Sequence, residues 1–198
     1  MIEQSLYCIT VSYTVGTEKL TVRKKTLLRT IRVSEEIDKL LQEDARAKRT
    51  SVNALVSAMM TRYAEWDRYT DRFGVISLST DLFRAIIDAS SEKELIRIAE
   101  ELGARLPREM MLFWYRKFNL DSFLRYIASN ARYARLGEYE LENNEGDYAL
   151  SIHHGFGEKW SKFLSAYLGQ TLQAGLELTP RFELTKNSLI ISFKTFQK

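Results

Sequence analysis

Hydrophobic residues begin to repeat at helical spacing just after Ser34. The repeat predicts a helix that starts at Glu35 and extends to about Arg49, because apolar residues three and four positions apart share one helix face. Ser34 is a residue type that caps helix starts, and the acids Glu35 and Glu36 suit a first turn. The predicted buried stripe consists of Ile37, Leu40, Leu41 and Ala45.

A second helical stripe follows a short connection at Thr50 and Ser51, which offer a second cap. The stripe keeps helical phase for several turns and is predicted to reach Phe73, where Gly74 provides a stop. Its apolar members are Val52, Leu55, Val56, Met59, Met60, Tyr63 and Trp66.

The segment in front of these two helices has the residue types of a β-strand. Residues 28–33 are rich in β-branched side chains and lead directly into Ser34. Farther upstream, residues 6–23 alternate weakly around a turn at Gly16 and Thr17. That weak pattern fits a β-hairpin and a loosely ordered arm equally well, so both stay open.

Beyond Gly74 the pattern changes to shorter elements. Residues 75–79 are predicted to form a short strand, and Thr80 opens a helix. Ser90 or Ser91 caps the next helix, which is expected to stop at Gly103 because glycine is common just past helix ends.

The remaining pattern alternates between helix and strand. Pro107 suits the first turn of a further helix, Asp121 begins another, and Gly137 ends the helical block. After it we expect a hairpin of residues 138–142 and 147–153 around a turn at 143–146, a helix that contains Trp160, and strands at 182–184 and 189–193.

Composition narrows the class of protein. A chain of 198 residues can form one medium domain or two small ones, and 45% hydrophobic with 12% aromatic residues argues against disorder. The single cysteine, Cys8, excludes an internal disulfide framework. No stretch reaches the roughly 18 apolar residues of a membrane span, and an N-terminus with Glu3 lacks the basic start of a signal peptide. We therefore expect a cytoplasmic protein without a membrane partner.

Basic charge is concentrated in front of the first predicted helix. The formal net charge is only +3, and this excess lies wholly within residues 1–74, because the rest of the chain holds equal numbers of both signs. No acidic residue lies between Lys19 and Ser34. Such a run is typical of phosphate binding, although solvated basic surface has the same composition. The run consists of Lys19, Arg23, Lys24, Lys25, Arg29 and Arg32.

A strand at residues 28–33 in front of two predicted helices predicts a dimer. If Ile31 and Val33 face the helices, then Thr30 and Arg32 face outward with Leu28 in line behind them, because side chains alternate along a strand. A lone strand leaves its backbone edges unpaired, and an identical strand from a second chain satisfies them. The resulting antiparallel ribbon is narrow enough to enter the major groove of DNA.

Residues 27–66 resemble the ribbon-helix-helix repressors of the Arc, MetJ and CopG type. The resemblance rests on LRTIRVSEEIDKLL at 28–41, on the length of the connection and on SVNALV at 51–56, and it covers only a small part of the chain. It implies a dimeric β-α-α fold that binds DNA. By position it assigns base contacts to Leu28, Thr30 and Arg32, and a phosphate clamp to Ser51, Val52 and Asn53. Leu28 departs from the usual polar type at its position.

The chemistry of these residues agrees with the resemblance. The Arg32 guanidinium can donate two hydrogen bonds to guanine, and Thr30 can bond to a base or pack its methyl group on thymine. Basic side chains nearby would add affinity that does not depend on sequence. They are Arg23, Lys24, Lys25, Arg29, Lys48 and Arg49.

The expected fold is therefore α+β with three parts. Residues 1–24 form an N-terminal arm or β-hairpin, and residues 25–74 form the ribbon-helix-helix DNA-binding domain. Residues 75–198 form an α+β domain, with helices followed by a hairpin, a helix and strands, that senses a ligand or mediates oligomerisation. No cofactor is expected.

Other candidate chemistry lies in the C-terminal part. The two histidines, His153 and His154, lie between a predicted strand and a glycine-rich turn, and adjacent residues on a strand face opposite sides, so a structural or pocket-lining role is favoured over metal binding. With Trp114 and Trp160 they form a candidate ligand pocket. The glycines of GFGEKW, at 155–160, lack the rest of a phosphate-binding loop.

Three functions from different classes compete at this point. The favoured one is a homodimeric repressor-type regulator of transcription that is associated with the nucleoid, binds double-stranded DNA and responds to a small-molecule effector or assembles further. The alternative is an antitoxin-type autorepressor that binds a partner protein through its C-terminal domain. The last is an enzyme that uses its N-terminal segment only to dimerise, and no catalytic set of residues supports it.

Overall fold

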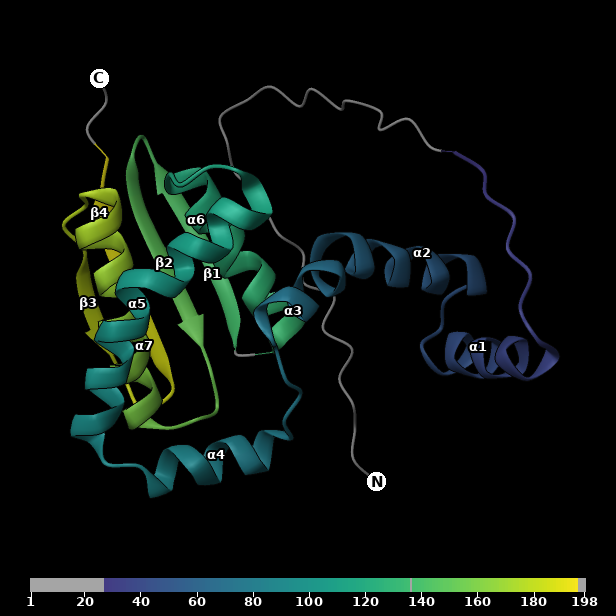
Figure 1. Cartoon of the computed structure of the whole chain (residues 1–198), viewed down its shortest axis with the longest axis horizontal. Coiled ribbons are helices and arrows are strands. Elements are labelled where there is room, and N and C mark those ends of the chain that lie inside the picture. The colour runs from purple at the N-terminus through teal and green to yellow at the C-terminus, as the bar shows by residue number, and fades with distance from the viewer. Residues whose placement is uncertain (1–26, 136, 196–198) are drawn as a thin grey trace. The chain divides into compact units, whose positions relative to one another are not determined.

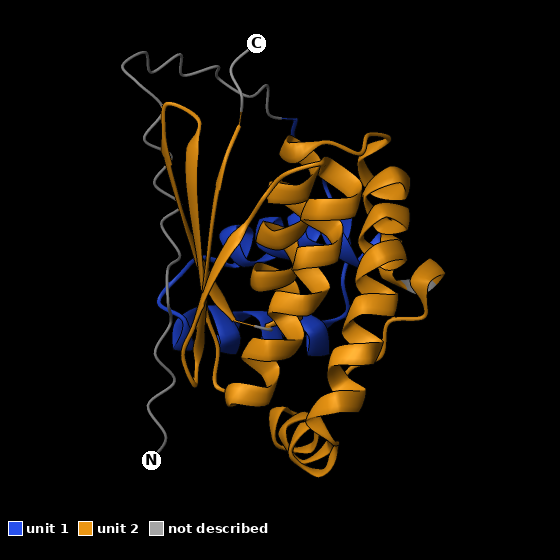
Figure 2. Cartoon of the chain, turned by 90° about the vertical axis from the view of Figure 1, so that its left-hand side faces the viewer, with its two compact units in different colours: residues 1–68 blue, residues 69–198 orange. Residues whose placement is uncertain are grey.

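The computed structural model describes residues 27–135 and 137–195 of the chain. The chain divides into two compact units, residues 1–68 and residues 69–198, which Figure 2 shows in blue and orange. Both contain helices, and the second also contains a four-stranded antiparallel sheet (Figure 1). The expected α+β class is thus confirmed, whereas the arm or hairpin expected at 1–24 lies outside the described residues.

The first helix of the first unit is α1, Glu35–Ala47. It starts where the sequence predicts, because the Ser34 hydroxyl accepts the N–H of Ile37 at 3.4 Å. It ends in a tight turn in which the N–H of Thr50 bonds to the carbonyl of Ala45 at 2.9 Å. The residue that makes this turn is Arg49, whose φ of 50° is left-handed, a conformation that glycine usually supplies.

The second predicted helix is also present. Helix α2, Val52–Arg62, is capped by Ser51, whose hydroxyl accepts the N–H of Ala54 at 3.1 Å. It continues through the π-helix η1, Tyr63–Asp67, into α3, Arg68–Phe73, and Gly74 follows with a φ of 61°. The two compact units divide between Arg68 and Tyr69, ahead of the boundary expected at Gly74.

In the second unit, the segment that follows α3 is an exposed connection rather than a strand. Residues 75–79 have no regular structure, so the strand predicted there is wrong. A strand needs a neighbour for its backbone hydrogen bonds, and the described strands pair with one another farther along the chain. Ser79 instead caps α4, Thr80–Ala89, by accepting the N–H of Leu82 at 3.3 Å.

The longest helix of this unit passes through both residues that were expected to break it. Helix α5, Glu92–Tyr115, starts at its Ser91 cap and continues through Gly103 and Pro107, so the predicted stop and restart are wrong. Pro107 has no N–H to give to the Gly103 carbonyl four residues earlier. The hydroxyl of Thr171 donates to that carbonyl instead, at 3.0 Å, so the helix continues without an orphaned acceptor.

Gly103 has a packing role in place of a capping role. A methyl group at this position would overlap the backbone carbonyl of Tyr167 in helix α7, Glu158–Gln170. Glycine therefore lets α5 and α7 approach closely. The chain after α5 forms α6, Leu120–Ser129, with an Asn119 cap, and the π-helix η2, Asn130–Ala134.

The sheet has the strand order β1-β2-β4-β3, and all neighbours are antiparallel. Its strands are β1, Glu138–Asn144, β2, Asp147–His153, β3, Arg181–Leu184, and β4, Ser188–Lys194. The predicted hairpin and the predicted last two strands are confirmed. The π-helix η3, Thr171–Gly175, extends α7 toward β3. Figure 2 shows the sheet on one side of this unit and the helices on the other.

The core of the second unit lies between the sheet and the helices. Alternate residues of β2 and β4 are buried, as expected for a sheet with one covered face. They are Leu150, Ile152, Leu189, Ile191 and Phe193. Helix α7 packs on β3, β4 and α5, so it occupies the centre of the helical layer.

Candidate functional site

The segment expected to form the ribbon is exposed and pairs with no strand among residues 27–135 and 137–195. Residues 27–34 have neither helical nor strand structure. Leu28 is 93% exposed, and the side chains of Thr30 and Arg32 are exposed as well. Ile31 and Val33, which were expected to face inward, are 53% and 45% exposed. Side chains on both faces of this segment are therefore exposed, and no described strand pairs with its backbone.

The apolar stripes of α1 and α2 are also mostly uncovered. Ala45 is the buried residue of α1 and Leu55 that of α2, and the two helices contact each other. Several larger residues of the same stripes remain about half exposed. They are Ile37, Leu40, Met59, Met60 and Tyr63. Contiguous exposed apolar surface of this kind is a common feature of interaction sites.

The start of α2 has the geometry of a phosphate site. The first N–H groups of a helix have no partner within the helix, and the helix dipole adds positive potential there. The Ser51 hydroxyl takes the N–H of Ala54, which leaves those of Val52 and Asn53 as the donors that an anion could use. All three residues of the expected clamp thus lie at one helix start.

The basic residues expected to contact phosphate are only partly described. Arg23, Lys24 and Lys25 lie outside the described residues. Arg29 and Arg49 are exposed, while Lys48 forms an ion pair with Asp44 at 3.4 Å. Arg49 adopts its left-handed conformation directly before the Ser51 cap, so its side chain leaves the chain beside the start of α2.

The four residues of the expected ligand pocket are divided between different surroundings. Trp114 packs against Tyr69 and Tyr126, whereas Trp160 stacks on Phe163 at 4.7 Å between ring centroids. His153 is exposed, and His154 is buried. Neither of the two cavities described below is lined by any of these four residues.

His154 belongs to a chain of hydrogen bonds inside the core. The N–H of Phe156 donates to its Nδ1 at 3.3 Å, so the ring proton lies on Nε2, which donates to Ser161 at 2.9 Å. The Ser161 hydroxyl in turn donates to the carbonyl of Thr185 at 2.8 Å. Burial, aided by the neighbouring charge of His153, lowers the pKa of His154 to about 4. Every donor has an acceptor only when the imidazole is neutral, which makes this a structural histidine.

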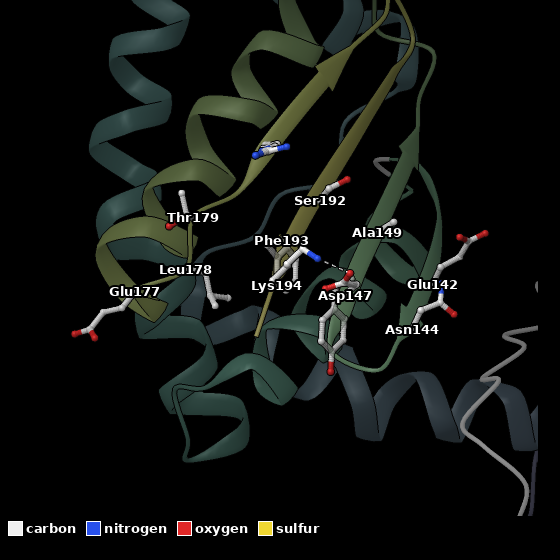
Figure 3. A pocket seen from close by; sticks show the side chains of 12 residues that line it. Glu142, Asn144, Asp147, Ala149, Glu177, Leu178, Thr179, Ser192, Phe193 and Lys194 are labelled. Atoms are coloured by element: carbon white, nitrogen blue, oxygen red, sulfur yellow. Dashed lines mark hydrogen bonds and ion pairs between the residues drawn. The ribbon is translucent and has the colours of Figure 1, made fainter. Parts of the chain in front are cut away.

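The larger cavity is a groove of about 480 Å³ at one edge of the sheet (Figure 3). It exists because β3 begins only at Arg181, which pairs with Ser192. The last residues of β4 therefore extend past β3. The loop with Glu177, Leu178 and Thr179 forms the opposite wall.

The groove has charges of both signs around an aromatic pair. Lys194 forms an ion pair with Asp147 at 2.7 Å, which Figure 3 marks with a dashed line. The rings of Tyr148 and Phe193 stack at 5.2 Å. Sequence patterns could not reveal this groove, because its lining comes from all four strands and a loop. Its volume lies within the range of small-molecule sites.

A second, smaller cavity of about 70 Å³ lies beside α6 and α7. It is lined almost entirely by apolar groups, and the hydroxyl groups of Tyr126 and Tyr167 hydrogen-bond to each other at 3.0 Å next to it. Burial raises the pKa of Tyr167 to about 12, so both phenols are protonated at neutral pH.

The described part of the chain has neither a candidate metal site nor a helix that could span a membrane. No group of three or more His, Cys, Asp or Glu side chains there is placed to hold a metal ion. None of the helices in residues 27–135 and 137–195 combines the length and the apolar character that crossing a membrane requires. No protein-family model matches the chain, and no curated protein matches it.

Proposed function

We propose that the protein is a homodimeric DNA-binding regulator of transcription with a ribbon-helix-helix N-terminal part. The observation that carries this proposal is the exposed state of residues 27–63. Residues 27–34, which have basic side chains and pair with no described strand, precede two helices whose apolar stripes are largely uncovered. A second copy of the same segment would cover both.

The dimer forms when residues 28–33 of two chains pair as antiparallel strands. Pairing satisfies the free backbone groups of both segments. Ile31 and Val33 then face one side of the ribbon, where the exposed residues of α1 and α2 from both chains form a shared core. The monomer lacks this core, so folding of the first unit and dimerisation are coupled.

The outer face of the ribbon contacts DNA bases. Thr30 and Arg32 enter the major groove, and Leu28 lies at the end of the same face. The N–H groups of Val52 and Asn53 hold a backbone phosphate, which sets the position of the ribbon in the groove. Arg29, Lys48 and Arg49 add affinity that decreases with salt.

The second unit serves as the sensing or assembly part of the regulator. Its core is continuous and covers a four-stranded sheet, unlike the short and poorly ordered tail of a typical antitoxin. The groove beside β4 has the volume of a small-molecule site and contains both charged and aromatic side chains. A thermal-shift screen of small molecules against the full chain would identify the effector.

The first test compares Arg32→Ala with Arg29→Ala by selecting bound DNA from a random pool at two salt concentrations. Both variants lose one exposed guanidinium group from the same segment. Arg32→Ala is expected to abolish the preference at one base position in each half-site, because a bidentate arginine-guanine contact discriminates by roughly 1–3 kcal/mol. Arg29→Ala is expected to weaken binding to all sequences alike and to keep the preference.

Two results contradict the proposal. If Arg32→Ala selects the same base pattern as the unchanged protein, the outer face of the ribbon is assigned wrongly. If sedimentation shows a monomer at concentrations where the chain is fully folded, the ribbon cannot form at all.

A second test uses the left-handed conformation of Arg49. Arg49→Gly is expected to raise the free energy of unfolding by about 1 kcal/mol, because glycine adopts this conformation without steric cost. The same change is expected to weaken DNA binding and to reduce the slope of log affinity against log salt by about 0.9, the value for one lost phosphate contact.

Lys48→Ala is the matched control for Arg49. It removes a neighbouring positive charge, and Lys48 has an ordinary negative φ of −89°. It should therefore weaken DNA binding without any gain in stability. An Arg49→Gly protein that gains stability and binds DNA with an unchanged salt slope would show that Arg49 does not contact phosphate.

A further inference from the structure

Two arginines of the second unit lie on one aromatic ring at the end of α5. The guanidinium carbon of Arg72 lies 5.3 Å from the centroid of Phe113, and that of Arg116 lies 5.8 Å from the same centroid. Tyr69 and Phe73 meet the edge of the Phe113 ring at centroid distances of 5.8 and 5.3 Å and hold it in place. The ring is thus a fixed platform that carries two cations.

The two arginines differ from several other arginines of this unit in their partners. Arg97, Arg105 and Arg125 each form an ion pair with a glutamate or aspartate on the same helix, at distances between 2.6 and 3.1 Å. Among the described side chains, no carboxylate lies within ion-pair distance of Arg72 or Arg116. Both guanidinium groups are exposed and keep their full hydrogen-bonding capacity.

Arg116 also has a backbone conformation that is uncommon for arginine, which it shares in this unit with Arg135. It ends α5 in the left-handed conformation, with a φ of 58°, and its N–H bonds to the carbonyl of Leu112 at 3.1 Å. An arginine in this place costs about 1 kcal/mol relative to glycine. Arg116 occupies this position despite the cost, and its side chain is one of the two cations on the Phe113 ring.

We propose that Arg72 and Arg116 form a phosphate-binding site on the Phe113 platform. Both guanidinium carbons lie within 6 Å of the centroid of the Phe113 ring. The site therefore presents two positive charges over the span of a few nucleotides. Planar guanidinium groups bind phosphate oxygens in pairs, and stacking on a ring leaves their N–H edges available. The same chemistry would hold the backbone of DNA or a free phosphorylated ligand.

The first arm of the test measures DNA binding and therefore rests on the proposed function. Arg72→Gln and Arg116→Gly each remove one cation, and the glycine suits the left-handed turn, so that the fold is kept. Arg105→Gln is the matched control, because it removes an exposed arginine of the same helix that is already paired with Glu109. We expect each site variant to reduce the salt slope of DNA affinity by about 0.9, and the control to leave it unchanged.

The second arm replaces DNA with inorganic tripolyphosphate. Its binding to the full chain is measured by titration calorimetry. Weaker tripolyphosphate binding, by tenfold or more in the Arg72→Gln/Arg116→Gly double variant, together with unchanged DNA slopes, would assign the site to a free phosphorylated ligand. If the unchanged protein binds no DNA, the proposed function fails while the tripolyphosphate arm still decides on the site. Equal behaviour of the site variants and Arg105→Gln in both arms overturns the site.

Discussion

Replacing Gly103 with alanine is expected to destabilise the second unit by about 3 kcal/mol, near the upper end of the usual cost of overpacking. The added methyl group would overlap the carbonyl, carbonyl carbon and Cα of Tyr167, all of which are backbone atoms of α7. Backbone atoms within a helix cannot turn aside as a flexible side chain can. Helices α5 and α7 must therefore move apart, which also strains the hydrogen bond from Thr171 to the Gly103 carbonyl.

Gly155→Ala is the control for this experiment. A methyl group at Gly155 would meet only the end of the Arg84 side chain, at 3.8 Å, which is an ordinary contact. Its effect on the free energy of unfolding should stay within about 0.5 kcal/mol. The free energy of unfolding of both variants is measured with denaturant. The fluorescence of the buried Trp114 and Trp160 monitors the transition. Equal stabilities of the two variants would mean that α5 and α7 do not pack as closely as the structure shows.

The second large effect concerns His154 and pH. The pKa of His154 falls from 6.5 to about 4 on folding, so the unfolded chain binds a proton at this residue more readily than the folded chain does. The contribution of His154 to the free energy of unfolding is constant above pH 6.5 and is lost as pH decreases toward 4. One pKa unit corresponds to roughly 1.4 kcal/mol, so the loss amounts to about 3 kcal/mol over this range.

The measurement compares unfolding free energies of the unchanged protein and His154→Gln between pH 7 and pH 4. The variant loses the hydrogen bonds to Phe156 and Ser161 and is less stable at pH 7, but it lacks the titrating ring. The difference between the two proteins should therefore shrink by about 3 kcal/mol as pH decreases.

His153→Gln provides the comparison for His154, because the chain has only these two histidines. His153 is exposed, and its removal leaves the hydrogen bonds of His154 in place. The decrease in stability toward pH 4 should persist in His153→Gln, although it becomes smaller because the neighbouring charge no longer lowers the pKa of His154. If the stability difference between the unchanged protein and His154→Gln does not vary with pH, folding does not lower the pKa of His154.

The assignment of individual residues to DNA contacts stays a prediction, whereas the helices that carry them could be predicted from sequence because their signals are local. The Ser34 and Ser51 caps, the two apolar stripes and the basic segment before them all follow from spacing along the chain. The exposed state of the ribbon segment adds the one fact that spacing cannot supply. The groove beside β4 and the arginines on Phe113 could not be predicted, because each joins residues from separate elements.

The sequence by itself determined where most helices begin and which segments form the hairpin and last strands. Cap residues such as Ser79 and Ser91 bond to N–H groups only three residues away, so their effect does not depend on the rest of the fold. The tertiary structure alone decided the fate of residues 75–79, which lack a neighbouring strand. It also decided the continuity of α5, since the donor that replaces the missing N–H of Pro107 comes from Thr171, and bonds between distant residues exist only after the chain has folded.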